Sequence, residues 1–360
     1  MKKLHQAFLV LIAGMLSGLA LAASAAGTTA THGKKVRHLQ QPVGALAIDG
    51  NRVAYDLNSR YAKKPHTTKV LVWNVHTGRT VKVSGKKTAH ADDTGSGAGA
   101  FQLAIAGSRV AWLINEGGNL ESQDYLLTSS VSHPKERQIA TALRRGDGCL
   151  GRESCAGPWL GGLVGSGNVI ALDRWTTDSQ GNVTSAGLDV LNGTKLKAIA
   201  TGTPTVQAVS SDAGREAVLH SDESVAVYSH SGDVLMTLPP ATAQEAALSG
   251  NNLVVVTKTR QLQVYDVRRG SLEKTLATHG TGLHNLDVQG NIAIYTTGKS
   301  VRAANLSSGK TRAVGTLGNR VAFARISNAG LAYAANGTRK AFGTSTLVFV
   351  PMARLKAAVG

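Results

Sequence analysis

The chain has 360 residues, of which 42% are apolar, so it can build a substantial core in one large domain or two small ones. Its formal net charge is +17 and its pI is near 10.1, but only 4% of its residues are aromatic. So few aromatic residues argue against stacking platforms for bases or sugar rings, and no nucleic-acid-reading motif is present, so nucleic acid is not an expected partner.

The N-terminus has the layout of a secretory signal peptide. Two lysines precede an apolar stretch over Phe8–Leu21, and Ala23-Ser24-Ala25 forms a small-residue cleavage site. The alternative is an uncleaved anchor helix over Ala7–Ala26, which is long enough to span a bilayer. No other long apolar run follows, so we expect no transmembrane segment after cleavage.

This layout divides the chain into three parts. We expect residues 1–25 to be the signal peptide, residues 26–41 to be a linker or closing strand, and residues 42–360 to form the folded domain. The mature protein is therefore expected outside the cytoplasm, as a secreted, periplasmic or cell-envelope protein. Its positive charge would favour anionic partners there, although it is equally explained by solubility alone.

The next feature is a hairpin that recurs along the chain. Each copy is an alternating strand, a short turn that contains glycine, and a second strand. The glycines of the last four copies are spaced 39, 38 and 39 residues apart. The turn glycines are Gly78, Gly193, Gly232, Gly270 and Gly309.

A second hairpin precedes each of these. Several of its copies turn on Gly-Asn or Gly-Ser, as in ALAIDGNRVAYDL from Ala45 and NLDVQGNIAIYTT from Asn285. The strand after the turn is almost wholly apolar, which is typical of a strand covered on both faces. Each repeating unit therefore has four strands, and about seven units follow one another.

Units of this kind without helical crossovers predict an all-β fold, a single β-propeller of about seven four-stranded blades. An open β-solenoid or a large sandwich is the alternative. Ser132–Arg145 and Thr242–Leu248 are also compatible with short helices. Because Pro351 and Met352 replace the usual turn in the last unit, we expect Lys35–Gln40 to supply its outer strand.

The stretches VLVWNVHTGRTVKV and QLQVYDVRRGSLEKTL resemble the WD40-like and quinoprotein-like repeats of the β-propeller superfamily, in a bacterial secreted type. The resemblance covers nearly all of Pro42–Gly360. The Gly-His and Trp-Asp signature of WD40 repeats is absent, and only Trp73-Asn74 and Tyr265-Asp266 come near it. The resemblance therefore implies the fold and no particular activity.

Long insertions occur only in the first three units, and we expect all of them at one face of the ring. Function on a rigid scaffold usually lies on such loops, although tolerated drift of surface insertions is the alternative. The insertions are Asn58–Thr68, Gly85–Ala100, Asn115–Asp124, Arg144–Trp159 and Arg174–Ser185. The candidate binding residues among them are Lys63, Lys64, His66, Asp92, Asp93, Arg144, Arg145, Asp147, Arg152, Glu153, Trp175 and Asp178.

The two cysteines, Cys149 and Cys155, lie close together in one insertion. In an oxidising compartment the simplest expectation is one disulfide, and metal binding would need further ligands at matched spacing. Each match to a catalytic motif lacks the secondary structure or the partner motifs that the chemistry requires. We therefore expect no catalytic residues, no metal and no cofactor.

These observations favour a secreted, non-enzymatic propeller that binds a protein or an anionic envelope component through its long loops, as a monomer. The alternatives are a propeller enzyme of the quinone-dependent dehydrogenase or lyase type, and a structural or stress-related protein with no small ligand.

Overall fold

The repeated hairpins of the sequence form seven four-stranded antiparallel sheets. The computed structural model describes residues 33–57, 67–89, 99–117, 121–145, 156–201, 206–212, 214–278, 282–316, 321–337 and 343–360, and the account below concerns these residues. They belong to one compact unit that spans Gly33–Gly360.

The strands fall into four positions, from the centre of the ring outward. The innermost strands are β2 (Leu46–Asp49), β6 (Ala100–Ala106), β10 (Gly157–Ser166), β14 (Val206–Asp212), β18 (Glu245–Ser249), β22 (Leu283–Gln289) and β26 (Val321–Ser327). The second strands are β3 (Arg52–Leu57), β7 (Arg109–Gly117), β11 (Val169–Thr177), β15 (Arg215–His220), β19 (Asn252–Val256), β23 (Ile292–Thr297) and β27 (Gly330–Asn336).

The third strands are β4 (Lys69–Asn74), β8 (Glu121–Ser130), β12 (Val183–Asn192), β16 (Val225–Ser229), β20 (Gln261–Asp266), β24 (Ser300–Asn305) and β28 (Ser345–Pro351). The outermost strands are β5 (Thr80–Lys82), β9 (Arg137–Arg145), β13 (Lys195–Thr201), β17 (Val234–Leu238), β21 (Ser271–Ala277), β25 (Thr311–Thr316) and β1 (Lys35–Leu39).

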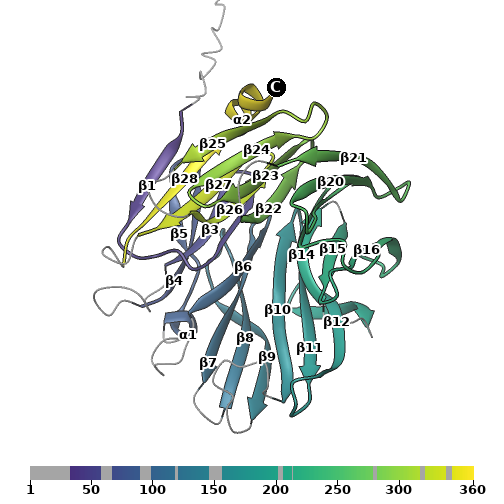
Figure 1. Ribbon diagram of the computed structural model, residues 1–360. Coiled ribbons are helices and arrows are strands. Elements are labelled where there is room, and N and C mark those ends of the chain that lie inside the picture. Colours follow the sequence, from purple (N-terminus) through teal and green to yellow (C-terminus); the bar gives the residue numbers. More distant parts are fainter. Residues whose placement is uncertain are drawn as a thin grey trace, which may run out of the picture. The chain divides into compact units, whose positions relative to one another are not determined.

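The last sheet is completed by the first strand of the chain. Strand β1 pairs antiparallel with β28, from Lys35 opposite Phe349 to Leu39 opposite Ser345, and Figure 1 shows the purple strand beside the yellow one. This confirms the closing strand expected from Lys35 onward. The Arg37 side chain also reaches the next sheet, where it donates to the Gly78 carbonyl oxygen at 2.8 Å.

The seven sheets close into a ring. The innermost strands of successive sheets contact one another, and β26 contacts β2. A cluster of buried apolar side chains fills each of the seven interfaces between neighbouring sheets. Each sheet is thus covered on both faces by its neighbours, which a single sheet cannot achieve alone. The unit is a seven-bladed β-propeller.

Polar side chains of the innermost strands tie each blade to the next. The Asp49 carboxylate accepts the Gly107 amide at 2.5 Å, and the Asp212 carboxylate accepts the Gly250 amide at 2.5 Å. These glycines begin the turns between first and second strands and have φ near +58°, which favours glycine. The turn chemistry read from the sequence therefore also sets the contact between blades.

Two segments that were compatible with helices are strands instead. Residues Arg137–Arg145 form β9, and Glu245–Leu248 of the second segment belong to β18. The described residues contain two helices, α1 (Lys86–Ala89) and α2 (Met352–Val359), and α2 was not expected. In this part of the chain, no helix is long and apolar enough to span a membrane.

Candidate binding face and central channel

One end of the ring carries the second-to-third-strand connections and the links between blades, and we call it the loop-bearing face. Strands β7 to β12, in blades 2 and 3, are nine or ten residues long, whereas all other strands have three to seven. Two of the five expected insertions, Asn115–Asp124 and Arg174–Ser185, are therefore mostly strand. They extend two hairpins and do not form irregular loops.

The structure describes four of the twelve candidate binding residues. Arg144 and Arg145 end β9, Trp175 lies in β11, and Asp178 begins the turn after β11. The other eight candidates lie outside the described residues: Lys63, Lys64, His66, Asp92, Asp93, Asp147, Arg152 and Glu153. Cys149 and Cys155 also lie outside them, so their disulfide stays a prediction.

Arg144 is a buried structural residue and not a free surface charge, since only 1% of it is exposed. Its guanidinium donates to both carboxylate oxygens of Asp124, at 2.5 and 3.0 Å, and to the Ser122 hydroxyl at 2.9 Å. A bidentate pair of this kind fixes both side chains in direction as well as distance. Arg144 thereby links strand β9 to strand β8 within blade 2.

The same guanidinium lies over the indole ring of Trp159, 3.7 Å from its centroid. Trp159 is the cross-strand partner of Trp175, and their rings are stacked with centroids 5.9 Å apart. Because a Cβ on Gly161 would lie 2.8 Å from the Trp175 ring, glycine is needed there for the stack to form. Trp159 was not recognised from the sequence, although its pairing with Trp175 across the Gly-Asn turn was available as a signal.

The remaining two described candidates lie at the surface. Arg145 forms an ion pair with Glu121 at 3.4 Å, between two largely exposed side chains. Asp178 accepts the side-chain amide of Asn182 at 3.0 Å and the backbone amides of Asn182 and Gln180 at 2.8 and 2.9 Å, which lowers the pKa of its carboxyl group. Asp178 therefore shapes its own turn, as expected from the sequence DSQGN.

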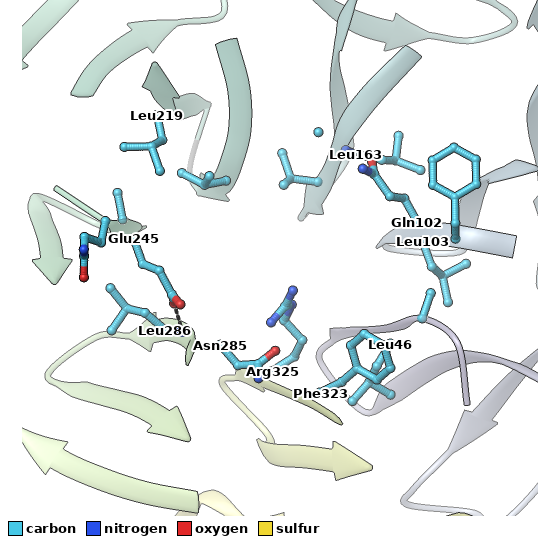
Figure 2. Close-up of a pocket in the computed structure, with 17 residues that line it drawn as sticks. Leu46, Gln102, Leu103, Leu163, Leu219, Glu245, Asn285, Leu286, Phe323 and Arg325 are labelled. Carbon is cyan, nitrogen blue, oxygen red and sulfur yellow. Dashed lines mark hydrogen bonds between the residues drawn. The ribbon is translucent and has the colours of Figure 1, made fainter. Parts of the chain in front are cut away.

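A cavity of about 420 Å³ lies at the mouth of the central channel on the loop-bearing face. All seven innermost strands or the residues just before them contribute to its wall, which combines leucine and phenylalanine side chains with polar ones such as Gln102, Asn285 and Arg325 (Figure 2). The Arg325 side chain enters the open centre of this ring. Among the described residues, no three His, Cys, Asp or Glu side chains are grouped to hold a metal ion.

Two partly buried carboxyl groups flank Arg325. Glu245 accepts the Leu286 amide at 2.7 Å, and Asp287 accepts the Ile326 and Val288 amides at 2.9 Å each. Burial raises the pKa of both carboxyl groups, and the nearby Arg325 charge opposes this rise. Sequence reasoning missed these residues because they come from blades 5, 6 and 7 and belong to no local motif.

Charge is segregated between the rim and the channel. The seven outermost strands hold ten Lys and Arg residues and one acidic residue, Glu273. The seven innermost strands hold four acidic residues and one basic residue, Arg325. Basic side chains on the exposed edge strands also discourage edge-to-edge aggregation. The positive charge of the molecule is thus displayed outward.

Comparisons with known proteins agree with this architecture. The chain is similar to the WD40 β-propeller domain of Doa1, with a TM-score of 0.54 and 11% identity over 89% of this chain and 99% of that one. It is also similar to a chain of the Mitotic Checkpoint Complex, with a TM-score of 0.54 and 14% identity over 95% of this chain and 99% of that one. What these structures share with the chain is the β-propeller fold. No family model and no curated protein matches the sequence of this propeller.

Proposed function

We propose that this protein is a secreted, non-enzymatic binding propeller that engages a protein or an anionic envelope component through its loop-bearing face. The observation that carries the proposal is the extension of blades 2 and 3. Ring closure needs only strands of the length seen in the other blades, yet these two blades continue as long hairpins at that face.

The internal structure of the extension supports a binding role. A bidentate Arg144–Asp124 pair and stacked tryptophans hold the hairpins rigid, and a rigid surface loses little conformational freedom when a partner binds. Tryptophan and arginine are also the residue types that contribute most to protein interfaces. One structural neighbour is itself a chain of a multi-component complex, which agrees with such a role.

The basic rim supports an anionic partner. Positive side chains outnumber acidic ones on the outermost strands taken together, and most of them lie on β1, β9 and β13, so an anionic polymer or surface is attracted to this part of the rim. This attraction is screened by salt, because exposed charges interact weakly beyond about 10 Å at 0.1 M ionic strength. The charge would therefore raise the rate of encounter, and the loop-bearing face would provide specificity.

The experiment is co-sedimentation of the mature protein with isolated cell envelope at low and high salt. A face variant replaces Lys63, Lys64, Arg145 and Arg152 by Ser. A matched control removes the same charge from exposed residues in or beside the turns at the opposite end: Arg79, Lys195, Lys197 and Arg268. Arg144 is left in place because its burial makes it structural.

The proposal predicts that the wild type and the control variant bind and that the face variant does not. Equal loss in both variants would mean that net charge alone causes retention. Binding by all three, or by none, would remove the loop-bearing face as the interaction surface.

Secretion is tested separately on the full chain. If Ala23-Ser24-Ala25 is the cleavage site, the N-terminal sequence of the exported protein begins at Ala26. Recovery of an uncleaved chain in the membrane fraction would instead favour the anchor helix over Ala7–Ala26.

A further inference from the structure

The cavity at the channel mouth has the size of a small-molecule site. Its volume, about 420 Å³, falls within the range of roughly 300 to 1,000 Å³ that is common for ligand pockets. Apolar side chains from separate blades line part of its wall, among them Leu46, Leu103, Leu163, Leu286 and Phe323 (Figure 2), and polar groups make up the larger part of the exposed lining. A few polar groups placed in an apolar wall are what such pockets use to orient a ligand.

Arg325 is the polar group at the centre of this cavity. Its Nη1 donates to the Ala324 carbonyl oxygen at 2.8 Å, which is its one hydrogen bond within the described part of the chain. A guanidinium carries five N–H donors, so four remain for a ligand. No ion pair involves Arg325 among the described residues, since the two nearby carboxyl groups are bonded to backbone amides.

The negative charges of Glu245 and Asp287 offset the positive potential around Arg325 only in part. Burial raises the pKa of Glu245 and Asp287, so both are held closer to the neutral form than exposed acids. An oxygen of Glu245 also lies 3.5 Å from Nδ1 of His284. The cavity thus presents the free N–H donors of Arg325 close to leucine and phenylalanine side chains.

We infer that the channel mouth binds a small monocarboxylate with an apolar body, such as a medium-chain aliphatic acid. The carboxylate is held by two N–H donors of Arg325, the arrangement that a planar guanidinium offers to a planar carboxylate. The apolar body lies against Leu103, Leu163 and Leu286. Arg325 belongs to blade 7 and not to the extended hairpins of blades 2 and 3, so variants of Arg325 test this site without changing the residues of the proposed macromolecular interface.

The first test is isothermal titration calorimetry of the mature protein with hexanoate, hexan-1-ol and hexylamine. These probes share one apolar chain and differ in the charge of the head group. The inference predicts that hexanoate binds at least tenfold more tightly than the other two. Tighter binding of hexylamine would show that Glu245 and Asp287 dominate, and equal or absent binding of all three would remove the carboxylate site.

The second test replaces Arg325. Arg325→Gln should weaken hexanoate binding at least tenfold and leave the weak binding of hexan-1-ol unchanged, while Arg325→Lys should weaken hexanoate binding less. The matched control is Arg52→Gln, because Arg52 likewise donates to a backbone carbonyl, that of Gly107 at 3.0 Å, but outside the cavity. Unchanged hexanoate affinity in Arg325→Gln would overturn the inference.

Thermal unfolding followed by circular dichroism establishes that each variant is folded before titration. If Arg325→Gln does not fold, the three probes on the wild-type protein still decide between a carboxylate site and its alternatives. Loss of hexanoate binding in Arg325→Gln together with loss of hexan-1-ol binding would indicate a collapsed cavity. In that case the Arg325→Lys variant and the wild-type series determine the outcome.

Discussion

At the scale of single residues, burial decides what a charge does. Arg144 and Arg145 are neighbours in the sequence and both were expected at a binding surface. Arg144 is buried and bonded to both oxygens of Asp124, whereas Arg145 reaches Glu121 across solvent at 3.4 Å. The alternation of side chains along β9 places them on opposite sides of the strand. A buried pair and an exposed pair therefore lie side by side in one strand.

The two pairs should differ sharply in their contribution to stability. Asp124→Ala leaves the Arg144 guanidinium buried without its counter-charge, so we expect it to lower the free energy of unfolding by about 3 to 5 kcal/mol. Glu121→Ala removes the partner of an exposed arginine and should cost less than about 1 kcal/mol. Urea unfolding measures both. Equal costs would mean that Arg144 is solvated.

Glu216 provides a test of pH dependence at the same scale. It is fully buried, and one carboxylate oxygen accepts the Ser211 hydroxyl at 3.0 Å and lies 2.8 Å from Nε2 of His230. Its other oxygen has no partner among the described residues. Burial raises the pKa of this carboxyl group, and the contacts with His230 and Ser211 oppose the rise.

A carboxyl group with a raised pKa in the folded state favours folding while it is protonated. Its contribution is greatest below the unfolded pKa, near 4.5, and is lost as pH rises toward the higher folded pKa. Glu216→Gln should therefore match the wild type near pH 4 and be more stable by about 1 kcal/mol near pH 8. The control is Glu273→Gln at an exposed position of β21. A gain that is the same at both pH values would contradict this assignment.

At the scale of whole elements, pairing partners override local preference. The segment over Ser132–Arg145 has alanines and charged residues that suit a helix, yet its C-terminal nine residues are β9. They pair with β8, whose residues Leu126 and Leu127 are buried between blades. Helix propensity amounts to a few tenths of a kcal/mol per residue, so an open edge of a buried sheet outweighs it.

The helix α2 shows the opposite case. Pro351 precedes the good helix formers MARLKAAV, a start signal that was available in the sequence but was masked by the expected strand. Because β1 already supplies the fourth strand of blade 7, the C-terminal segment has no edge to join. It covers the apolar cluster between blades 6 and 7 instead, with Leu355 and Val359 fully buried.

This packing makes α2 part of the core. Leu355→Ala should lower the free energy of unfolding by about 2 to 4 kcal/mol, because it leaves a cavity in a closed apolar cluster. Lys356→Ala changes the exposed neighbour in the same helix and should have an effect below about 0.5 kcal/mol. Chemical unfolding of both variants provides the measurement. A negligible cost for Leu355→Ala would mean that α2 is only loosely attached.

At the scale of the molecule, the recurring glycine turns were enough to predict blades and a number of about seven, because each turn is a local signal that repeats. The replacement of the last turn by Pro351 and Met352 predicted the closing strand. The channel site was not predictable in this way. Glu245, Asp287 and Arg325 are about 40 residues apart from one to the next, and each resembles an ordinary surface charge in the sequence. Only ring closure brings them together. The long insertions were located, but the sequence did not distinguish the extended strands Asn115–Gly117 and Arg174–Thr177 from irregular loops.

Ring closure by β1 gives the molecule-scale prediction. A chain that begins at Gln40 lacks β1 and exposes the edge of β28, whereas a chain that begins at Gly33 keeps the complete unit. The shorter chain also loses the hydrogen bonds of Arg37 to Gly78 and Thr80 of blade 1. Blade 7 therefore loses its outermost strand, and the hydrogen bonds that this strand makes to blade 1 are lost with it. We expect several kcal/mol of destabilisation, which corresponds to a melting temperature lower by about 10 °C or more.

The single substitution Arg37→Ala separates the two contributions. It keeps β1 paired with β28 but removes the hydrogen bonds to blade 1 and the stacking of the guanidinium over Trp73. If the ring is closed mainly by strand pairing, this variant should melt close to the wild type and far above the shortened chain. If it melts as low as the shortened chain, the side-chain tie to blade 1 closes the ring. A shortened chain with an unchanged melting temperature would show that the propeller is held closed by the apolar clusters between its blades alone.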